Sequence, residues 1–384
     1  MKMTINNEHK KLNVPNLRFP EFQGEWKKTK FGDIATGFDY GMNAAAKNYD
    51  GVNKYIRITD IDEASSTYTD KDIVSPDGIL TDNYLVNNRD ILLARTGAST
   101  GKSYLYKQSD GKLYYAGFLI RANVTTHDPY FVFSQLHTHR YWRWVSIMSA
   151  RSGQPGINSQ EYSSFPIYTT SIEEESKIAK LLSLLDERIA TQNKIIDKLQ
   201  SLIRGIRNDV FGKFRKSVGV NAMVGEVLSY EQPQPYIVED TEYTAEGIPV
   251  LTANKAFVLG YTSETDGIYA KGDCIIFDDF TLDCKYVDFP FKVKSSAIKI
   301  LTAKDKELLR YTFEFMKYLD LSTDEHKRHY IAETQNQELF LPTAQVVRTI
   351  AHAFSALSSR MKTVTKQRVM FESQKQYLLR QMFI

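Results

Sequence analysis

The residues whose types and spacing most directly suggest chemistry lie in the segment GASTGKS at 97–103, after a strand-like run, DILLAR, at 90–95. A Walker A loop needs four residues between its glycines, whereas this segment has three between Gly97 and Gly101. The following residues predict a strand, so no helix N-terminus is expected there to hold phosphate. A nucleotide-using enzyme at this loop is therefore only an alternative interpretation.

The same loop suits contact with DNA. Its glycines let the backbone come close to a phosphate, and its side chains can donate hydrogen bonds to phosphates and base edges. A solvated hairpin without a function is the other interpretation. The candidate DNA-binding residues are Arg95, Thr96, Ser99, Thr100 and Lys102.

Other motifs that resemble catalytic ones lack a required part. The string at 128–131, DPYF, lacks the second proline of an adenine methylase loop and is predicted to open a helix. The Glu-x-Lys of some nucleases occurs at 175–177, where acids also suit the first turn of a helix. His137 and His139 cannot share one helix face at that spacing. The sequence therefore predicts a chain that is not an enzyme and that holds no metal.

Two polar loops, at 150–164 and 327–338, each precede a long predicted helix. Amide and guanidinium groups read adenine and guanine edges, although surface loops are also polar without any function. The candidates in the first loop are Arg151, Gln154 and Asn158, and those in the second are Lys327, Arg328, Gln335 and Asn336.

A heptad pattern over residues 173–211 predicts a long helix that needs a partner. At about 1.5 Å per residue this helix would span roughly 57 Å. Its apolar seam has Gln192 as a polar exception and is formed by Ile178, Leu182, Leu185, Ile189, Ile196, Leu199, Ile203, Ile206 and Val210.

The partner helix is predicted at 350–383, where the first helix recurs after an offset of 172 positions. An antiparallel pair would place Arg368 near Gln192 and Lys375 opposite Asp186, and these polar residues would fix the helix register. Extension of both basic side chains into solvent is the alternative.

The segments between the helices also repeat in order, with Gly225-Glu226-Val227 matching Gly32-Asp33-Ile34. Strands are predicted at 54–61, 90–95, 102–107, 112–124 and 248–254, and helices at 129–149 and 304–320. The predicted fold class is α+β, with two mixed α/β globules, two long antiparallel coiled-coil helices and a pseudo-two-fold internal repeat. The expected division is an N-terminal arm at 1–24, globules at 25–171 and 217–345, and helices at 172–216 and 346–384.

The composition is typical of a cytoplasmic protein. Of the 384 residues 42% are hydrophobic, and we find no run of 18 apolar residues that would predict a membrane span. The only two cysteines, Cys274 and Cys284, are interpreted as buried thiols.

The formal net charge of +3 is unevenly distributed, because residues 217–345 hold 12 Lys and Arg against 21 Asp and Glu. A DNA-binding surface in this segment could gather Lys255, Lys285, Lys327 and Arg328 on one face. Alternatively, partners supply the phosphate contacts, and Asp278 and Asp279 read cytosine amino groups.

These features together resemble the specificity subunit of type I restriction-modification systems. The resemblance rests on the duplicated halves, on the long helix at 173–211, and on the phrases VPNLRFPEFQGEW, ARTGASTGK and SGQPGINSQEY. It implies that each globule is a target recognition domain that reads one half of a bipartite double-stranded DNA site, while the helices set the spacing.

The resemblance also implies partners. Two methylase subunits would use S-adenosylmethionine to methylate adenine N6, and restriction subunits would use ATP and Mg²⁺ to translocate and cleave DNA. This chain itself would bind no cofactor. A structural scaffold whose globules bind proteins instead of DNA is the competing function.

Overall fold

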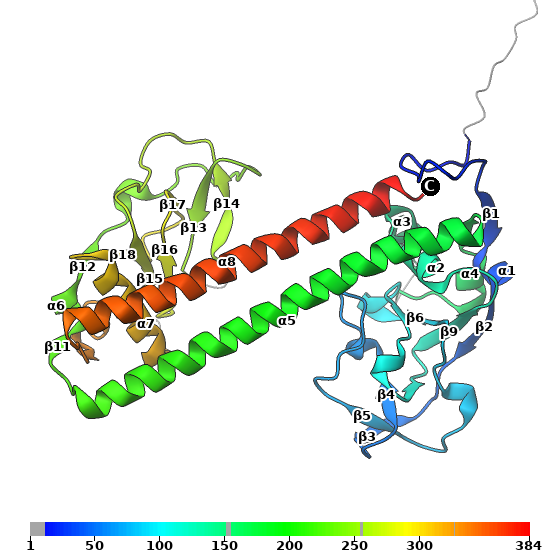
Figure 1. Cartoon of the computed structure of the whole chain (residues 1–384), viewed down its shortest axis with the longest axis horizontal. Coiled ribbons are helices and arrows are strands. Elements are labelled where there is room, and N and C mark those ends of the chain that lie inside the picture. The colour runs from blue at the N-terminus through cyan, green and yellow to red at the C-terminus, as the bar shows by residue number, and fades with distance from the viewer. Residues whose placement is uncertain (1–11, 151–154, 254–255, 326) are drawn as a thin grey trace, which may run out of the picture. The chain divides into compact units, whose positions relative to one another are not determined.

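The computed structural model describes residues 12–150, 155–253, 256–325 and 327–384, which form two compact units (Figure 1). Unit 1 contains the described residues up to Gln192 together with Gln367–Ile384, and unit 2 contains Asn193–Lys366. Each unit combines one α/β globule with parts of both long helices. The division of the chain into recognition domains and helices at the boundaries given above stays a prediction.

The two long helices are α5 (Ile172–Ser217) and α8 (Ala344–Gln381) (Figure 1). Helix α5 extends beyond the predicted range of 173–211, and α8 begins six residues before and ends two residues before the predicted range of 350–383. Three acids, Glu173 to Glu175, occupy the first turn of α5, and Arg215 and Lys216 occupy the last, as the helix dipole favours. All ten seam positions of the heptad pattern are buried or half-buried. The predicted seam is therefore confirmed.

The helices run antiparallel within each unit. In unit 1, Asp186 of α5 pairs with Lys375 of α8, and Arg188 packs over the ring of Phe371, so residue numbers rise on one helix as they fall on the other. In unit 2, Phe211 lies in one apolar cluster with Val347 and Ile350 near the start of α8. The predicted fold class is confirmed.

Unit 1 is built around a four-stranded antiparallel sheet of order β2-β9-β6-β7, flanked by the pairs β1-β10, β3-β5 and β4-β8. Its strands are β1 (Lys27–Lys30), β2 (Ala35–Tyr40), β3 (Ala45–Asn48), β4 (Lys54–Ile56), β5 (Val74–Asp77), β6 (Asp90–Ala94), β7 (Ser103–Leu105), β8 (Leu113–Tyr115), β9 (Leu119–Val124) and β10 (Pro166–Thr169). Its shorter helices are α1 (Phe31–Ile34), α2 (Pro129–Gln135), α3 (His139–Met148), α4 (Ser159–Ser164), η1 (Ile58–Asp60), η2 (Asp82–Tyr84), η3 (Gly97–Ser99) and η4 (Gln108–Asp110).

Unit 2 repeats this plan, with a four-stranded sheet of order β12-β18-β15-β16, a three-stranded sheet of order β14-β13-β17 and the pair β11-β19. Its strands are β11 (Ala222–Met223), β12 (Leu228–Glu231), β13 (Ile248–Leu251), β14 (Val258–Thr262), β15 (Cys274–Asp278), β16 (Cys284–Val287), β17 (Lys292–Val293), β18 (Ile298–Ala303) and β19 (Glu338–Leu339). Its shorter helices are α6 (Val224–Val227), α7 (Lys306–Leu319), η5 (Gln234–Tyr236) and η6 (Thr334–Asn336).

The internal repeat extends to hydrogen bonds. In α1 the carboxylate of Asp33 accepts a bond from the backbone N–H of Lys30 at 3.0 Å, and in α6 Glu226 accepts the same bond from Met223 at 2.7 Å. The matched strand pairs β4-β8 and β13-β17 are both parallel. The two halves of the sequence therefore fold into equivalent units, as the repeat predicted.

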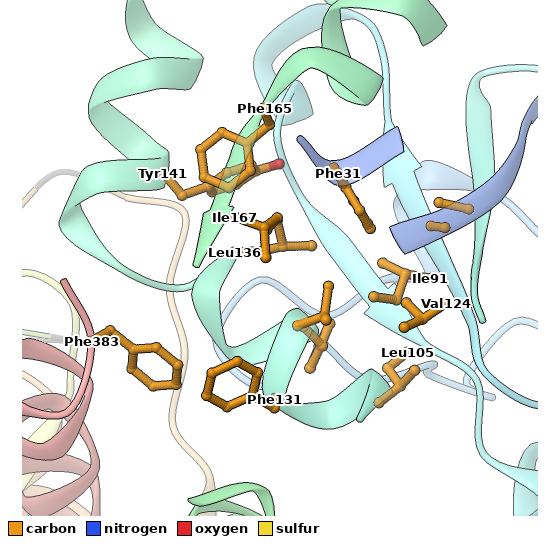
Figure 2. Packing of buried hydrophobic residues seen from close by; sticks show 14 of the residues in the cluster. Phe31, Ile91, Leu105, Val124, Phe131, Leu136, Tyr141, Phe165, Ile167 and Phe383 are labelled. Atoms are coloured by element: carbon orange, nitrogen blue, oxygen red, sulfur yellow. The ribbon is translucent and has the colours of Figure 1, made fainter. Parts of the chain in front are cut away.

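The core of unit 1 joins the globule to the chain's last residues. Figure 2 shows Phe383 pointing toward Phe131 of α2, with their ring centroids 5.3 Å apart. Trp26 also contacts both rings edge-on. The buried aromatic contacts stabilise the C-terminal end of α8 against α2.

Three predicted elements are wrong in length. The strand predicted at 54–61 ends at Ile56, and Ile58–Asp60 form the short helix η1 instead. The strand predicted at 112–124 is two strands, β8 and β9, because the backbone turns at Gly117, whose N–H donates to Met42. The helix predicted at 129–149 is also two, α2 and α3. Thr138 separates them, because its hydroxyl donates to Gln135 O at 2.7 Å and also accepts from the N–H of Tyr141.

Candidate nucleic-acid interface

Two loops predicted to bind DNA meet at one edge of the unit 1 sheet. The β6–β7 loop follows the end of β6, and the segment before α4 pairs with it through a bridge between Thr96 and Gly156. The N–H of Gly97 donates to Pro155 O at 3.0 Å, and that of Ile157 donates to Arg95 O at 2.9 Å. Loops some 60 positions apart in sequence thus form one surface.

Arg95 is the cation held most firmly at this edge. Its guanidinium lies over the ring of Tyr40, 4.6 Å from the centroid, and Nη1 lies 3.4 Å from Gly117 O. Its backbone N–H donates to Phe118 O at 3.1 Å, and Tyr40 Oη accepts from the N–H of Ser159 at 3.3 Å. The guanidinium is half-buried, so it is pre-organised while still reaching solvent.

The other candidates in unit 1 have roles within the fold. Thr100 is 6% exposed, and its hydroxyl donates to Gly97 O at 2.8 Å. Lys102 pairs with Glu63 at 3.2 Å, and Asn158 caps α4 by accepting from the N–H of Glu161 at 2.9 Å. Thr96 and Ser99 are half-buried in the loop, with Thr96 in the bridge described above.

Buried tyrosines hold the loop from below. Tyr162 Oη donates to Ala94 O at 2.6 Å and accepts from the N–H of Gly101 at 3.1 Å, while Tyr141 Oη donates to Gly101 O at 2.8 Å. Burial raises the pKa of both phenols, so they remain neutral donors. Gly101 has φ +94°, and a Cβ there would lie 2.8 Å from Val145 Cγ1. The glycine spacing therefore serves close packing, not a phosphate loop.

Unit 2 brings its polar loop to the equivalent sheet edge, beside the β15–β16 loop. The N–H of His329 donates to Asp279 O at 3.0 Å, and that of Tyr330 donates to Asp279 Oδ1 at 2.7 Å. Arg328 lies over Phe280 with 5.4 Å to the ring centroid, and its Nη1 lies 3.1 Å from Ser296 O and 3.3 Å from Asp279 Oδ2. Nearly half of the Arg328 side chain, 48%, is exposed.

The two edges are alike in their contacts, although Arg95 lies in the β6–β7 loop and Arg328 in the loop before β19. Arg95 and Arg328 each lie on an aromatic ring and each donate to a carbonyl of the turn that precedes the equivalent strand, β9 or β18. The rings, Tyr40 and Phe280, and the two turns were missed at the level of sequence. The motifs contain no signal for them, because tertiary contacts bring these positions together: β2 carries Tyr40, and hydrogen bonds from His329 and Tyr330 to Asp279 join the two loops of unit 2.

The remaining unit 2 candidates are mostly engaged internally. Lys327 pairs with Glu325 at 2.5 Å and Glu333 at 2.9 Å. The side-chain amides of Gln335 and Asn336 donate to backbone carbonyls one turn earlier, at 2.7 and 3.0 Å. Lys285 stands half-buried on β16, in register with Ile276 of β15.

Asp278 and Asp279 do not support the hypothesis that they read cytosine. They are 7% and 1% exposed. Asp278 Oδ1 accepts from the N–H groups of Phe280 and Thr281, and Asp279 accepts from the segment that carries Arg328. Both carboxylates thus organise the loop from within.

Three candidate DNA-binding residues lie outside the described residues: Arg151, Gln154 and Lys255.

The predicted register residues lie on facing helices of unit 1. Lys375 Nζ is 2.6 Å from Asp186 Oδ1, and Tyr130 of α2 donates to the other oxygen of the same carboxylate. Arg368 lies 3.6 Å from Glu372 on its own helix, and Gln192 Oε1 is buried without a hydrogen bond.

The histidine pair on the aromatic segment has separate environments. His137 is enclosed between Phe133 O, to which Nδ1 donates at 2.9 Å, and the hydroxyl of Ser66 at 3.0 Å from Nε2. Burial lowers the pKa of His137 to about 4, so the ring is neutral at pH 7. His139 is exposed. Across the described ranges, no group of three His, Cys, Asp or Glu side chains is placed to hold a metal ion.

Within the part of the chain that the structure describes, no helix combines the length and apolar character needed to cross a bilayer.

The two α/β units are built on the same plan, and each presents an arginine at the same end of its four-stranded sheet. Comparison with known proteins finds a similarity over the first half of the chain. Residues 23–201 match the type I restriction modification DNA specificity domain. Over these residues the chain is similar to the specificity subunits of type I restriction-modification systems.

Individual relatives match parts of the chain. The specificity subunit of the type I restriction enzyme EcoR124I/EcoR124II from Escherichia coli is 45% identical over 126 residues, which cover 31% of each chain. The MjaVIII specificity subunit from Methanocaldococcus jannaschii is 24% identical over 231 residues, or 59% of this chain. The matches span 31% and 51% of the relatives' own lengths.

A solved structure shares the fold over a longer range. The S subunit of a type I restriction-modification system from M. genitalium matches with a TM-score of 0.69 and 15% identity, covering 97% of this chain and 99% of that one.

Proposed function

We propose that this chain is the non-catalytic DNA sequence-recognition subunit of a type I restriction-modification complex. In this proposal each globule reads one half of a bipartite site. The observation that carries the proposal is that each sheet edge presents an arginine stacked on an aromatic ring, Arg95 from the β6–β7 loop and Arg328 from the loop before β19. An arginine supplied by a different loop in each unit suits two readers of different sequences.

Arginine is the side chain suited to this task. A guanidinium stacked on an aromatic ring keeps its planar fork in a fixed orientation and can bind guanine O6 and N7 with two parallel hydrogen bonds. Arg328 reaches solvent at 48% exposure, whereas Lys327 is neutralised by two glutamates. We therefore assign base reading to the arginines and leave the amides of Gln335 and Asn336 a structural role.

The acidic balance of residues 217–345 is compatible with this assignment. Several acids, such as Asp278, Asp279 and Glu314, are buried and accept internal hydrogen bonds, so they do not face DNA. The phosphate contacts of unit 2 would then come largely from partner subunits, which is the arrangement that the excess of acids favours.

The long helices would set the distance between readers and dock the partners. Two readers on one face of B-DNA lie about 34 Å apart per helical turn. In unit 1 the Lys375–Asp186 pair would fix the register of the helices. Exposed apolar side chains on the helices, including Leu184, Leu202, Val369 and Met370, offer surface for two methylase subunits. S-adenosylmethionine, ATP and Mg²⁺ would be bound by the methylase and restriction subunits.

DNA footprinting of the chain with its methylase subunit tests the proposal. We expect protection of two short patches about one helical turn apart, because each globule contacts one half-site. No protection would favour a protein scaffold instead, and hydrolysis of ATP by the isolated chain would favour an enzyme at the GASTGKS loop.

A further inference from the structure

A buried cluster of two arginines and one glutamate joins three helices of unit 2. Arg207 of α5 donates to Glu314 Oε2 of α7 from Nε at 3.0 Å and from Nη2 at 2.6 Å. Arg310, one turn before Glu314 on α7, donates to Oε1 at 2.6 Å. The Arg310 guanidinium also reaches α8, at Phe354 O and the hydroxyl of Ser358.

The cluster is enclosed. The side chains of Glu314, Arg310 and Arg207 are 1%, 8% and 12% exposed. The Arg310 guanidinium packs over Tyr286 at 4.9 Å and over Phe313 at 5.4 Å, which partly compensates a second buried positive charge. Buried ion pairs contribute little net stability compared with apolar residues of the same volume, because both charges lose their hydration. A role other than stability is therefore the better explanation.

The cluster permits one register of the helices. Phe211, one turn beyond Arg207 on α5, packs against Tyr311 and Phe315 of α7. Along the contact between α5 and α7, a polar contact is therefore followed one turn later by an apolar contact. If α5 slipped by one turn relative to α7, Arg207 would leave Glu314 and an apolar face would meet a buried carboxylate. Apolar contacts alone would tolerate such a slip better, as in coiled coils whose register depends on a buried polar residue.

We infer that Arg207, Glu314 and Arg310 are positioning residues that fix the globule of unit 2 in one register on its helices, and thereby fix the DNA spacing at which its half-site is read. This inference rests on the proposed function. One helical turn is about 5.4 Å, and base pairs rise by about 3.4 Å, so a one-turn slip would displace the reader by roughly 1.6 base pairs. The spacer between half-sites is the quantity that the cluster should control.

The test replaces the cluster with apolar side chains in the triple variant Arg207→Leu, Glu314→Leu and Arg310→Met. Arg207→Met alone is a second variant, which cuts the link to α5 and keeps the pair within α7. The control is Asp209→Asn with Lys213→Met, which removes an exposed ion pair of α5 with side chains 60% and 72% exposed. Thermal unfolding first establishes which variants fold.

The first readout is the helix register in the full chain. Spin labels are attached to cysteines introduced at Lys216 of α5 and Lys306 of α7, and the distance between the two labels is measured. The two native thiols are buried, and burial raises the pKa of Cys274 to about 12 and that of Cys284 to about 11. The native thiols are therefore protected from the label. We expect a single narrow distance in the unaltered chain and the control, and a distribution broadened by about one 5.4 Å turn in the cluster variants. An equally narrow distribution in a folded cluster variant would overturn the inference.

The second readout is N6-methyladenine in a plasmid library whose half-sites are separated by the natural spacer or by one or two base pairs more or fewer. The complete complex should prefer the natural spacer, and the cluster variants should lose about 5- to 150-fold of that preference, as for one mismatched base pair. Broadened distances with an unchanged spacer preference would refute the link to DNA spacing. If even the unaltered complex showed no spacer preference, the proposed function would fail, while the distance measurement would still decide on the register.

Discussion

Replacing Arg95 with alanine is expected to abolish base discrimination in one half of the site. The loss of a bidentate contact to guanine costs about 1–3 kcal/mol of discrimination. The ratio of methylation at the correct site to methylation at a site altered at that base should therefore fall by roughly 5- to 150-fold. The guanidinium is held in place by the ring of Tyr40 and lies 3.4 Å from Gly117 O. Sequencing of methylated adenines in cells that carry the variant complex measures the effect.

Two further variants make this result specific. Arg95→Lys keeps the charge but not the planar fork, so it should retain overall DNA affinity while losing discrimination. Lys107→Ala removes a cation that follows β7 at the opposite end of the sheet, and it should leave methylation unchanged. Full discrimination by Arg95→Lys would show that Arg95 contacts phosphate and does not read a base.

Replacing Glu174 with alanine is expected to destabilise unit 1 by about 3–5 kcal/mol, because it removes one partner of a buried ion pair. The Glu174 carboxylate is 1% exposed and accepts two bonds from Arg18 at 2.7 Å, one from Thr170 Oγ1 at 2.6 Å and one from Trp26 Nε1 at 3.4 Å. It thereby anchors the end of the predicted N-terminal arm, through Arg18, and the adjoining Trp26 to the first turn of α5.

Urea unfolding followed by tryptophan fluorescence measures this loss, since Trp26 lies at the site. Glu173→Ala on the same turn is the matched control, because Glu173 is exposed. This substitution removes only the interaction of one carboxylate with the helix dipole, which should lower the free energy of unfolding by about 0.3–1 kcal/mol. Equal unfolding midpoints for the two variants would contradict the buried-anchor interpretation.

The acids at 173–175 show how far the sequence could predict the structure. A helix start was predictable, because acids cluster in first turns. The burial of Glu174 and Glu175 was not, since it depends on Arg18 and on Asp128, whose N–H donates to Glu175 Oε2 at 3.0 Å from 47 positions away.

The repeat and the heptads predicted the fold class, because both are periodic patterns that can be recognised in the sequence before any tertiary contact is known. The candidate interface was only partly predictable. The loop after Arg95 was found from its glycine-flanked motif and the loop with Arg328 from its polar composition, whereas the rings beneath the two arginines come from segments about 50 positions away. Polar composition also marked Gln335, Asn336 and Asn158, whose side chains form local backbone bonds, as amides commonly do in loops and caps.

The central claim is that each globule reads one half of the DNA site independently. The most direct measurement exchanges residues 217–345 for the corresponding segment of another specificity subunit and maps N6-methyladenine across the genome of cells that carry the complete system. The account predicts that one half of the methylated sequence changes and that the half read by unit 1 is retained. A change in both halves would contradict it.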